Sequence, residues 1–314
     1  MFALRGLAVC LSFFVVVYAI ASALISQVWR FRRGKSATPQ ETSTLLLNLR
    51  ALPLLSAGLV TLAIVLPSFL ELEPRTSAEP IGEIPALLAL GCLGLFVAGF
   101  ANALRTWRKT NRIVNGWLQG AIAESRSEGV SLLRIRPAGP ALAVAGICAP
   151  RVLLSEAAVA ALSEAELKAA LKHELAHVHR RDNLKKLFFR ITAFPGMSAL
   201  EMEWSDATEM AADDAAVSSS AEALDLAAAL IKISRLVTPR ETPALTTALV
   251  PSVNSALNAR IERLVTWEQH RPSKNVTSHS WYLAPALLAA TFCFVASYGA
   301  LLARMHQMTE WLVR

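Results

Sequence analysis

Long uncharged apolar runs constrain this chain more than any other feature. Three of them cover about residues 7–29, 51–70 and 84–104, and a fourth covers about 281–303. Each is long enough for a helix to cross a bilayer core of about 30 Å. The fourth run begins with a tryptophan and a tyrosine, which are common at membrane interfaces. We therefore expect a mainly α-helical membrane protein with four transmembrane helices.

The charge of the loops between these runs predicts the orientation of the chain. Basic residues follow the first and third runs, whereas the loop at 71–83 is acidic. Because basic loops stay in the cytoplasm, we expect both termini, including a short tail at 304–314, to lie outside. A signal peptide is the alternative for the first run, but the run is too long for a signal core. The expected location is a bacterial-type inner membrane.

The composition agrees with a multi-pass membrane protein. Hydrophobic residues make up 54% of the chain and the mean hydropathy is +0.42. The formal net charge of +7 is what cytoplasmic loops would contribute, and no motif for direct nucleic-acid binding is present. The four cysteines are scattered, and they indicate neither a disulfide framework nor a metal site.

A short motif in the segment at 105–280 points to metal chemistry. It reads His-Glu-Leu-Ala-His, with His173 and His177 four residues apart. Residues at this spacing share one face of a helix, so both imidazoles can point at one metal ion. Glu174 can then reach a water molecule at the metal and act as the general base. A charged surface helix with two solvated histidines is the alternative.

The residues around this motif predict a cytoplasmic α+β domain, inserted between the third and fourth membrane spans. Ser163 and Glu166 form a capping box that begins the helix. A strand is expected at 132–136 and a hairpin at 142–154. An edge strand near the metal could bind an extended substrate, or the hairpin could be purely structural. The proline-containing segment at 238–255 is expected to be a mobile loop near the site.

The segment at 184–200 combines phenylalanines with lysines and an arginine. It is too short and too charged to span a membrane. Two interpretations remain open: the segment lies against the membrane surface, or it is part of the domain core.

Catalytic zinc usually has three protein ligands, so one more is needed. The best candidate is Glu209, on a later alanine-rich helix, with Asp213 one turn further on the same face. Asp213 could accept a hydrogen bond from a ligand histidine and so set its tautomer. Glu201 and Glu203 are weaker rivals for the ligand role, while two neighbouring aspartates, Asp206 and Asp214, are expected to be surface groups.

The motif with its flanking residues resembles one known family. His-Glu-Leu-Ala-His-Val-His-Arg-Arg-Asp-Asn, ending at Asn183, followed by Glu209-x-x-x-Asp213, is similar to the BlaR/MecR family of bacterial membrane metallopeptidases. The stretches at 148–155 and 256–264 resemble the strand before the zinc helix and a later helix of that family. Where the family often has a cysteine before the aspartate, this chain has Ala212.

The resemblance implies a gluzincin-like domain with Zn²⁺ held by His173, His177 and Glu209, and with Glu174 as the base. Asp182 matches the family motif, and it could support a ligand or be a simple helix-end charge. The implied substrate is a protein, for which a transcriptional repressor or the chain itself is a candidate. The family's receptors carry a penicillin-binding sensor after the fourth span. Since this chain ends soon after that span, we expect no β-lactam sensor domain in it.

Two other functions remain as alternatives. The first is a housekeeping membrane protease of the heat-shock or CAAX type, acting in membrane protein quality control. The second is a membrane scaffold with a structural metal site, although such a site would need no base at Glu174. An intramembrane protease fits less well, because lysines and arginines surround the motif.

Overall fold

The computed structural model describes residues 2–32, 38–74, 81–127, 130–135, 139–192, 197–236, 243–249, 255–270 and 298–308. These residues form mainly helices and one small mixed sheet. The chain divides into two compact units. One consists of Met1–Gly34, Asn48–Ala98 and Ser273–Arg314, and the other of Lys35–Leu47 and Gly99–Pro272.

Among the described residues, three helical stretches are long and apolar enough to cross a membrane: Phe2–Gln27, Pro39–Leu72 and Glu83–Leu118. They contain most of the first apolar run and all of the second and third, and they extend beyond the second and third at both ends. Most of the expected fourth span, at 281–303, lies outside the described residues. Residues 298–308, at its end, are helical.

Within the first unit, polar side chains make contacts among the apolar helices. Helix α2 (Pro39–Val60) continues through a π-helical turn, η1 (Thr61–Val65), into α3 (Leu66–Leu72). Pro67 has no N–H to donate to the carbonyl of Ala63. The hydroxyl of Tyr298 donates to that carbonyl instead, at 2.8 Å. In α1 (Phe2–Arg32), Arg5 is buried and forms an ion pair with Glu73 at 2.7 Å.

The second unit contains a five-stranded sheet in the order β1-β2-β4-β3-β5. After α4 (Glu83–Leu118) the strands are β1 (Ile122–Ser127), β2 (Val130–Ile135), β3 (Leu142–Ala145), β4 (Arg151–Ser155) and β5 (Thr246–Ala248). Only the β2–β4 pair is parallel. The strand and the hairpin expected from the sequence are both present.

The hairpin does not provide a free edge, so the expectation of an edge strand there is wrong. Strand β3 is paired on one side with β4 and on the other with β5, where Val144 faces Thr247. The segment expected to be a loop supplies β5, whose residues follow Pro243. Among the described residues, β5 therefore ends the sheet on the side that contacts helices α6 and α7.

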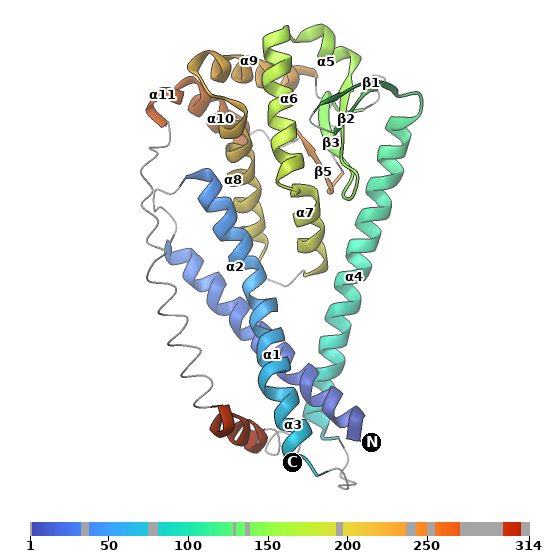
Figure 1. Cartoon of the computed structure of the whole chain (residues 1–314), viewed down its shortest axis with the longest axis vertical. Coiled ribbons are helices and arrows are strands. Elements are labelled where there is room, and N and C mark those ends of the chain that lie inside the picture. Colours follow the sequence, from blue (N-terminus) through green and yellow to red (C-terminus); the bar gives the residue numbers. More distant parts are fainter. Residues whose placement is uncertain are drawn as a thin grey trace. The chain divides into compact units, whose positions relative to one another are not determined.

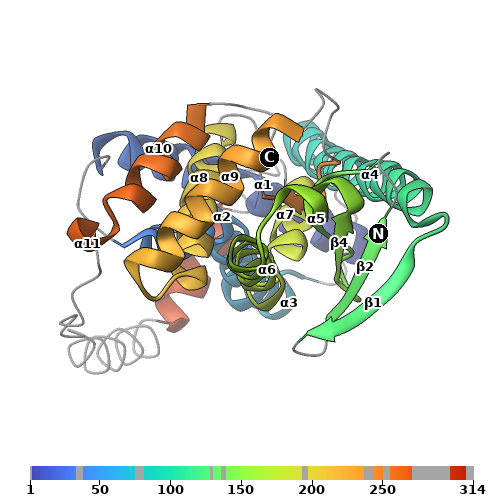
Figure 2. The same ribbon diagram turned by 90° about the horizontal axis from the view of Figure 1, so that it is seen from above.

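The other helices of the second unit pack either against this sheet or against one another. They are α5 (Glu156–Ala161), α6 (Glu164–His179), α7 (Asp182–Ile191), α8 (Ser198–Ala216), α9 (Ser220–Leu236), α10 (Ser255–Val265) and α11 (Trp267–His270). Helix α6 contacts α8 and α9 on one side and β3 and β5 on the other. Figure 1 shows α6 beside the sheet, and Figure 2 shows it between the sheet and the α8–α9 pair.

Local sequence features determine where α6 begins and where the chain turns after it. Ser163 and Glu166 form the expected capping box. After His179, Arg181 adopts a left-handed conformation with φ of 53°. This turn ends α6 and lets α7 begin at once with Asp182, so that the Asp182 side chain returns toward the last turn of α6.

Candidate metal centre

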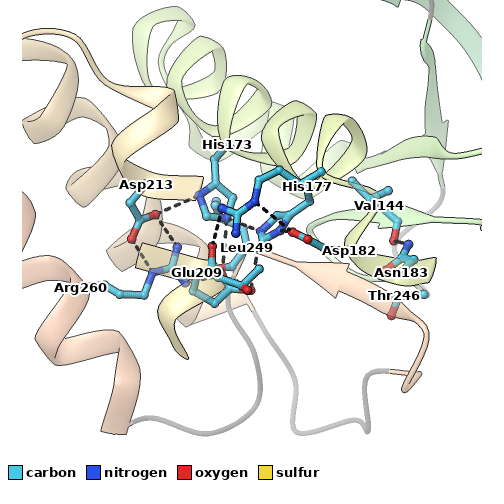
Figure 3. Close-up of polar contacts among 12 residues, drawn as sticks. Val144, His173, His177, Asp182, Asn183, Glu209, Asp213, Thr246, Leu249 and Arg260 are labelled. Atoms are coloured by element: carbon cyan, nitrogen blue, oxygen red, sulfur yellow. Dashed lines mark hydrogen bonds and ion pairs between the residues drawn. The ribbon is translucent and has the colours of Figure 1, made fainter. Parts of the chain in front are cut away.

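The two histidines of the motif project from one face of α6, as their spacing predicts. Both side chains are buried, and their rings are 4.8 Å apart between centroids. The Nε2 atoms of His173 and His177 lie 3.1 Å apart. Both nitrogens therefore face the same small volume between α6 and α8 (Figure 3).

Glu209 reaches this volume from α8. Its two carboxylate oxygens lie 3.5 Å from Nε2 of His173 and 3.6 Å from Nε2 of His177. One ligand atom from each of the three residues lies within 4.8 Å of the others, which makes this group able to hold a metal ion. Glu201 and Glu203, the weaker rivals, lie on the same helix but do not belong to this group.

Each histidine is held by a carboxylate at its other nitrogen. Nδ1 of His173 lies 2.9 Å from Asp213, and Nδ1 of His177 lies 2.8 Å from Asp182. A proton held on Nδ1 leaves the Nε2 lone pair free for a metal. Of the two interpretations of Asp182, its contacts agree with support for a ligand, because it is buried against His177 and also accepts a hydrogen bond from Lys185.

A buried arginine from α10 connects the acidic residues of the site. Arg260 donates two hydrogen bonds of 2.7 Å to Asp213 and forms a 3.0 Å ion pair with Glu209. It also donates to the backbone carbonyl of Leu249, just after β5. From the sequence alone, Arg260 is a conceivable oxyanion donor or a structural residue, and no local signal chooses between the two.

Glu174 is the most unusual group of the site. Its side chain is buried, and neither carboxylate oxygen has a hydrogen-bond partner among the described residues. Burial raises its pKa to about 8, although the nearby His173 opposes this shift. A buried carboxyl group without a hydrogen-bond partner costs free energy, so its retention at this position indicates a function.

The electrostatics of the cluster favour an added positive charge. Burial alone would lower the pKa of His173, but Asp213 and Glu209 raise it to about 9. Burial would raise the pKa of Glu209, but His177 and Arg260 hold it well below its usual range. The carboxylates thus attract a proton to His173. A divalent cation at the Nε2 atoms would likewise neutralise the negative charge of the carboxylates, and nitrogen and oxygen donors of this kind suit zinc.

A cavity of about 230 Å³ opens beside Glu209. Its lining comes from α7, α8 and the β5 segment, and consists of Lys186, Phe189, Arg190, Glu201, Trp204, Ser205, Glu209, Pro243, Ala244, Thr246 and Ala248. Residues 243–248 of the segment expected to be a loop near the site do lie there. The cavity is smaller than a typical drug-sized pocket, and it would suit a single side chain of a bound chain.

Other described polar residues do not belong to the group that could hold a metal ion. His179 and Asp206 are exposed, in agreement with a surface role. Asp214 forms an ion pair with Arg263 on α10. Like Arg260, His270 is a conceivable oxyanion donor from the sequence alone, and its side chain lies outside the described residues.

The fold and the site together define a class: a protein with candidate membrane-spanning helices and a helical metal-binding group of the metallopeptidase kind. The sequence model of the BlaR1 peptidase M56 family matches residues 83–264, more than half of the chain. The chain belongs to this family, which confirms the resemblance found in the sequence. The match implies a membrane metallopeptidase with a protein substrate. No curated protein matches the chain.

Proposed function

We propose that this protein is a zinc-dependent membrane endopeptidase with His173, His177 and Glu209 as the metal ligands. The observation that carries the proposal is the convergence of these three buried side chains beside the unpartnered carboxylate of Glu174. A structural metal site would need the three ligands but not this carboxylate. The scaffold alternative therefore leaves the burial of Glu174 without an explanation.

The side chains of the site have separate tasks in peptide hydrolysis. A bound zinc ion would supply Lewis acidity, which polarises the substrate carbonyl and lowers the pKa of water. Glu174 accepts a proton from the attacking water and returns it to the leaving amine nitrogen. Asp213 and Asp182 keep the Nδ1 protons of the two histidines in place. Arg260 holds Glu209 and Asp213 in position.

The substrate is a cytoplasmic or membrane-associated protein, with a transcriptional repressor as one candidate. The cytoplasmic placement of residues 105–280 is supported by the basic residues that follow the first and third apolar runs. An extended segment of the substrate could add to β5, which ends the sheet beside α6 and α7 among the described residues.

Two substitutions test the assignment in the purified, membrane-reconstituted protein. Glu174→Gln should keep zinc but lower peptide cleavage by about 10²–10⁴-fold, because the proton acceptor is lost. Glu209→Ala should lose zinc, since two histidines alone hold it poorly. Asp206→Asn, at an exposed carboxylate of α8, is the control and should change neither zinc content nor turnover. Cleavage at the normal rate by Glu174→Gln would exclude the proposed chemistry.

The same variant separates signalling from housekeeping. Cells carrying Glu174→Gln should accumulate uncut substrates, which can be compared with cells carrying the natural chain. One stabilised regulatory protein supports a signalling peptidase. Many stabilised, misfolded membrane proteins would instead favour the quality-control alternative.

A further inference from the structure

Helix α7 has an apolar face that points away from the site. Leu184, Leu187, Phe188 and Ile191 follow the i, i+3, i+4, i+7 spacing of one helix face. Leu184 is 44% exposed and Ile191 is 40% exposed, so the described residues leave much of this face uncovered. Four large apolar side chains on ten residues are unusual for a surface in contact with water.

The opposite face of α7 belongs to the site. Lys186, Phe189 and Arg190 line the cavity beside Glu209. The ring of Phe189 packs edge-on against Trp204 with centroids 4.9 Å apart. Whatever contacts the outer face of α7 is therefore separated from the cavity by the width of a single helix.

Hydrogen bonds hold α7 rigidly against the sheet and α6. Asn183 donates to the carbonyl of Gly146 at 3.1 Å, and Lys186 donates to the carbonyl of Thr246 at 2.8 Å. Asp182, the first residue of α7, contacts His177. The orientation of the outer face is thus tied to the orientation of the metal centre.

The C-terminal end of α7 packs against an apolar part of α4 within the same unit. The side-chain amide of Asn102 donates to the carbonyl of Arg190 at 3.3 Å. A Cβ atom at Gly99 would collide with the carbonyl oxygen of Ile191, so the two backbones touch there and only glycine fits. Gly99 and Asn102 both lie in the uncharged run at 84–104.

The position of this contact along α4 gives its depth. Gly99 precedes Arg105, the first charge after the run, by about 9 Å along the helix axis at roughly 1.5 Å per residue. Interfacial amphipathic helices bury their apolar face about 5–10 Å into the boundary between headgroups and acyl chains. The contact therefore lies at the depth where such a helix would lie.

We propose that the outer face of α7 lies in the cytoplasmic interface of the lipid bilayer. The face contacts lipid, because the end of α7 touches α4 inside the apolar run that is itself expected in the membrane. Arg181, which is exposed just before α7, would then lie among the headgroups, where anionic lipids attract it. If the protein is the peptidase proposed above, its substrates are polypeptide segments held at the membrane surface.

A spin label tests the location of the face without any need for activity. The label is placed at Leu184→Cys or Ile191→Cys, with the four natural cysteines replaced by alanine, in vesicles containing anionic lipid. The control is Leu224→Cys on α9, where the leucine is 52% exposed. Collisions with dissolved oxygen, relative to a water-soluble nickel chelate, should be several-fold more frequent on α7 than at the control.

Two results would overturn the proposal. Collision with the nickel chelate as frequent as at Leu224→Cys would place the face in water. Shielding from both reagents would show that protein, not lipid, covers it. Zinc content of each labelled variant reports that the site is still folded.

A second measurement tests the consequence for substrates. One peptide is offered free in solution or anchored to the vesicle by two acyl chains. The preference is the ratio of the cleavage rates of the anchored and the free peptide. Leu184→Glu with Ile191→Glu should lower this ratio at least tenfold, because charges are costly in the interface. Leu224→Glu with Ile231→Glu on α9 is the matched control, and it should keep the preference.

The outcomes separate the two proposals. A lipid-exposed label on a protein that cleaves no peptide would leave α7 in the membrane and reject the proposed peptidase. Cleavage with no difference between free and anchored peptide, in the natural chain, would retain the peptidase and reject the membrane-held substrate.

Discussion

At the scale of single residues, Arg260 explains how so many carboxylates can be buried together. It is 1% exposed and contacts both Asp213 and Glu209. Its charge holds the pKa of Asp213 below its usual range, against the effect of burial. Asp213 can then remain ionised beside His173 and keep a proton on Nδ1. Arg260 is thus a positioning residue that acts through two neighbours.

Replacing this arginine should therefore be far more harmful than replacing a surface one. Arg260→Met leaves two buried carboxylates without a cation, and should lower the free energy of unfolding by about 3–5 kcal/mol. Arg260→Lys should recover part of this loss, since it keeps the charge but not the two-pronged hydrogen bonding. Chemical denaturation in detergent, together with zinc content, provides the measurement.

The matched control lies on the same helix. Arg263 forms an ion pair with Asp214 in which the side chains are 15% and 17% exposed. Water can therefore reach Asp214 when Arg263 is replaced, and the loss should be near the upper end of the roughly 0–1 kcal/mol of solvent-exposed pairs. Arg263→Met should have that small effect. Equal losses for Arg260→Met and Arg263→Met would contradict the role assigned to Arg260.

At the scale of elements, α6 carries the chemistry because both of its ends are defined. The hydroxyl of Ser163 accepts from the N–H of Glu166, and the Glu166 carboxylate accepts from the N–H of Ser163. Lys232 of α9 also donates to Glu166 at 2.7 Å. The capping box thus determines where the helix begins and also connects it to its neighbour, which holds the ligand face toward α8.

Loss of this cap should loosen the first turn of α6 in particular. Ser163→Ala should cost about 1 kcal/mol and speed the hydrogen exchange of backbone amides in the first turn of α6. Ser234→Ala is the control, since the hydroxyl of this half-buried serine of α9 donates to the carbonyl of Ile231 in its own helix. Exchange rates in α6 that do not change in Ser163→Ala would show that packing alone defines this end.

At the scale of the whole molecule, the candidate metal centre joins helices that are distant in the sequence. His173 and His177 come from α6, Glu209 from α8 and Arg260 from α10. The family match at 83–264 covers all of these elements and α4. Metal binding should therefore stabilise the packing of the second unit as well as enabling catalysis.

Removal and return of the metal test this coupling. Chelation should lower the thermal unfolding temperature, and zinc at about 100 times its dissociation constant should restore about 2.7 kcal/mol. The Glu209→Ala variant should show no such response to zinc. A similar shift in that variant would place the stabilising metal at some other group.

Features that depend on residues close in the sequence could be predicted without the structure. The apolar runs, the capping box and the shared face of His173 and His177 follow from helical periodicity and from the length needed to cross a bilayer. Glu209 was predicted as well, but only because Asp213 follows it by one turn and the family pattern contains both.

Features that depend on distant residues needed the tertiary structure. Arg260 gave no local signal, because a guanidinium is buried only where folded carboxylates surround it. The same holds for β5, which looked like a loop until its pairing with β3 made it a strand. Likewise, the sequence alone did not decide whether α7 belongs to the domain core or lies against the membrane surface. Only packing could show that one face lines the cavity and the other is exposed, since periodicity separates two faces without saying what each one meets.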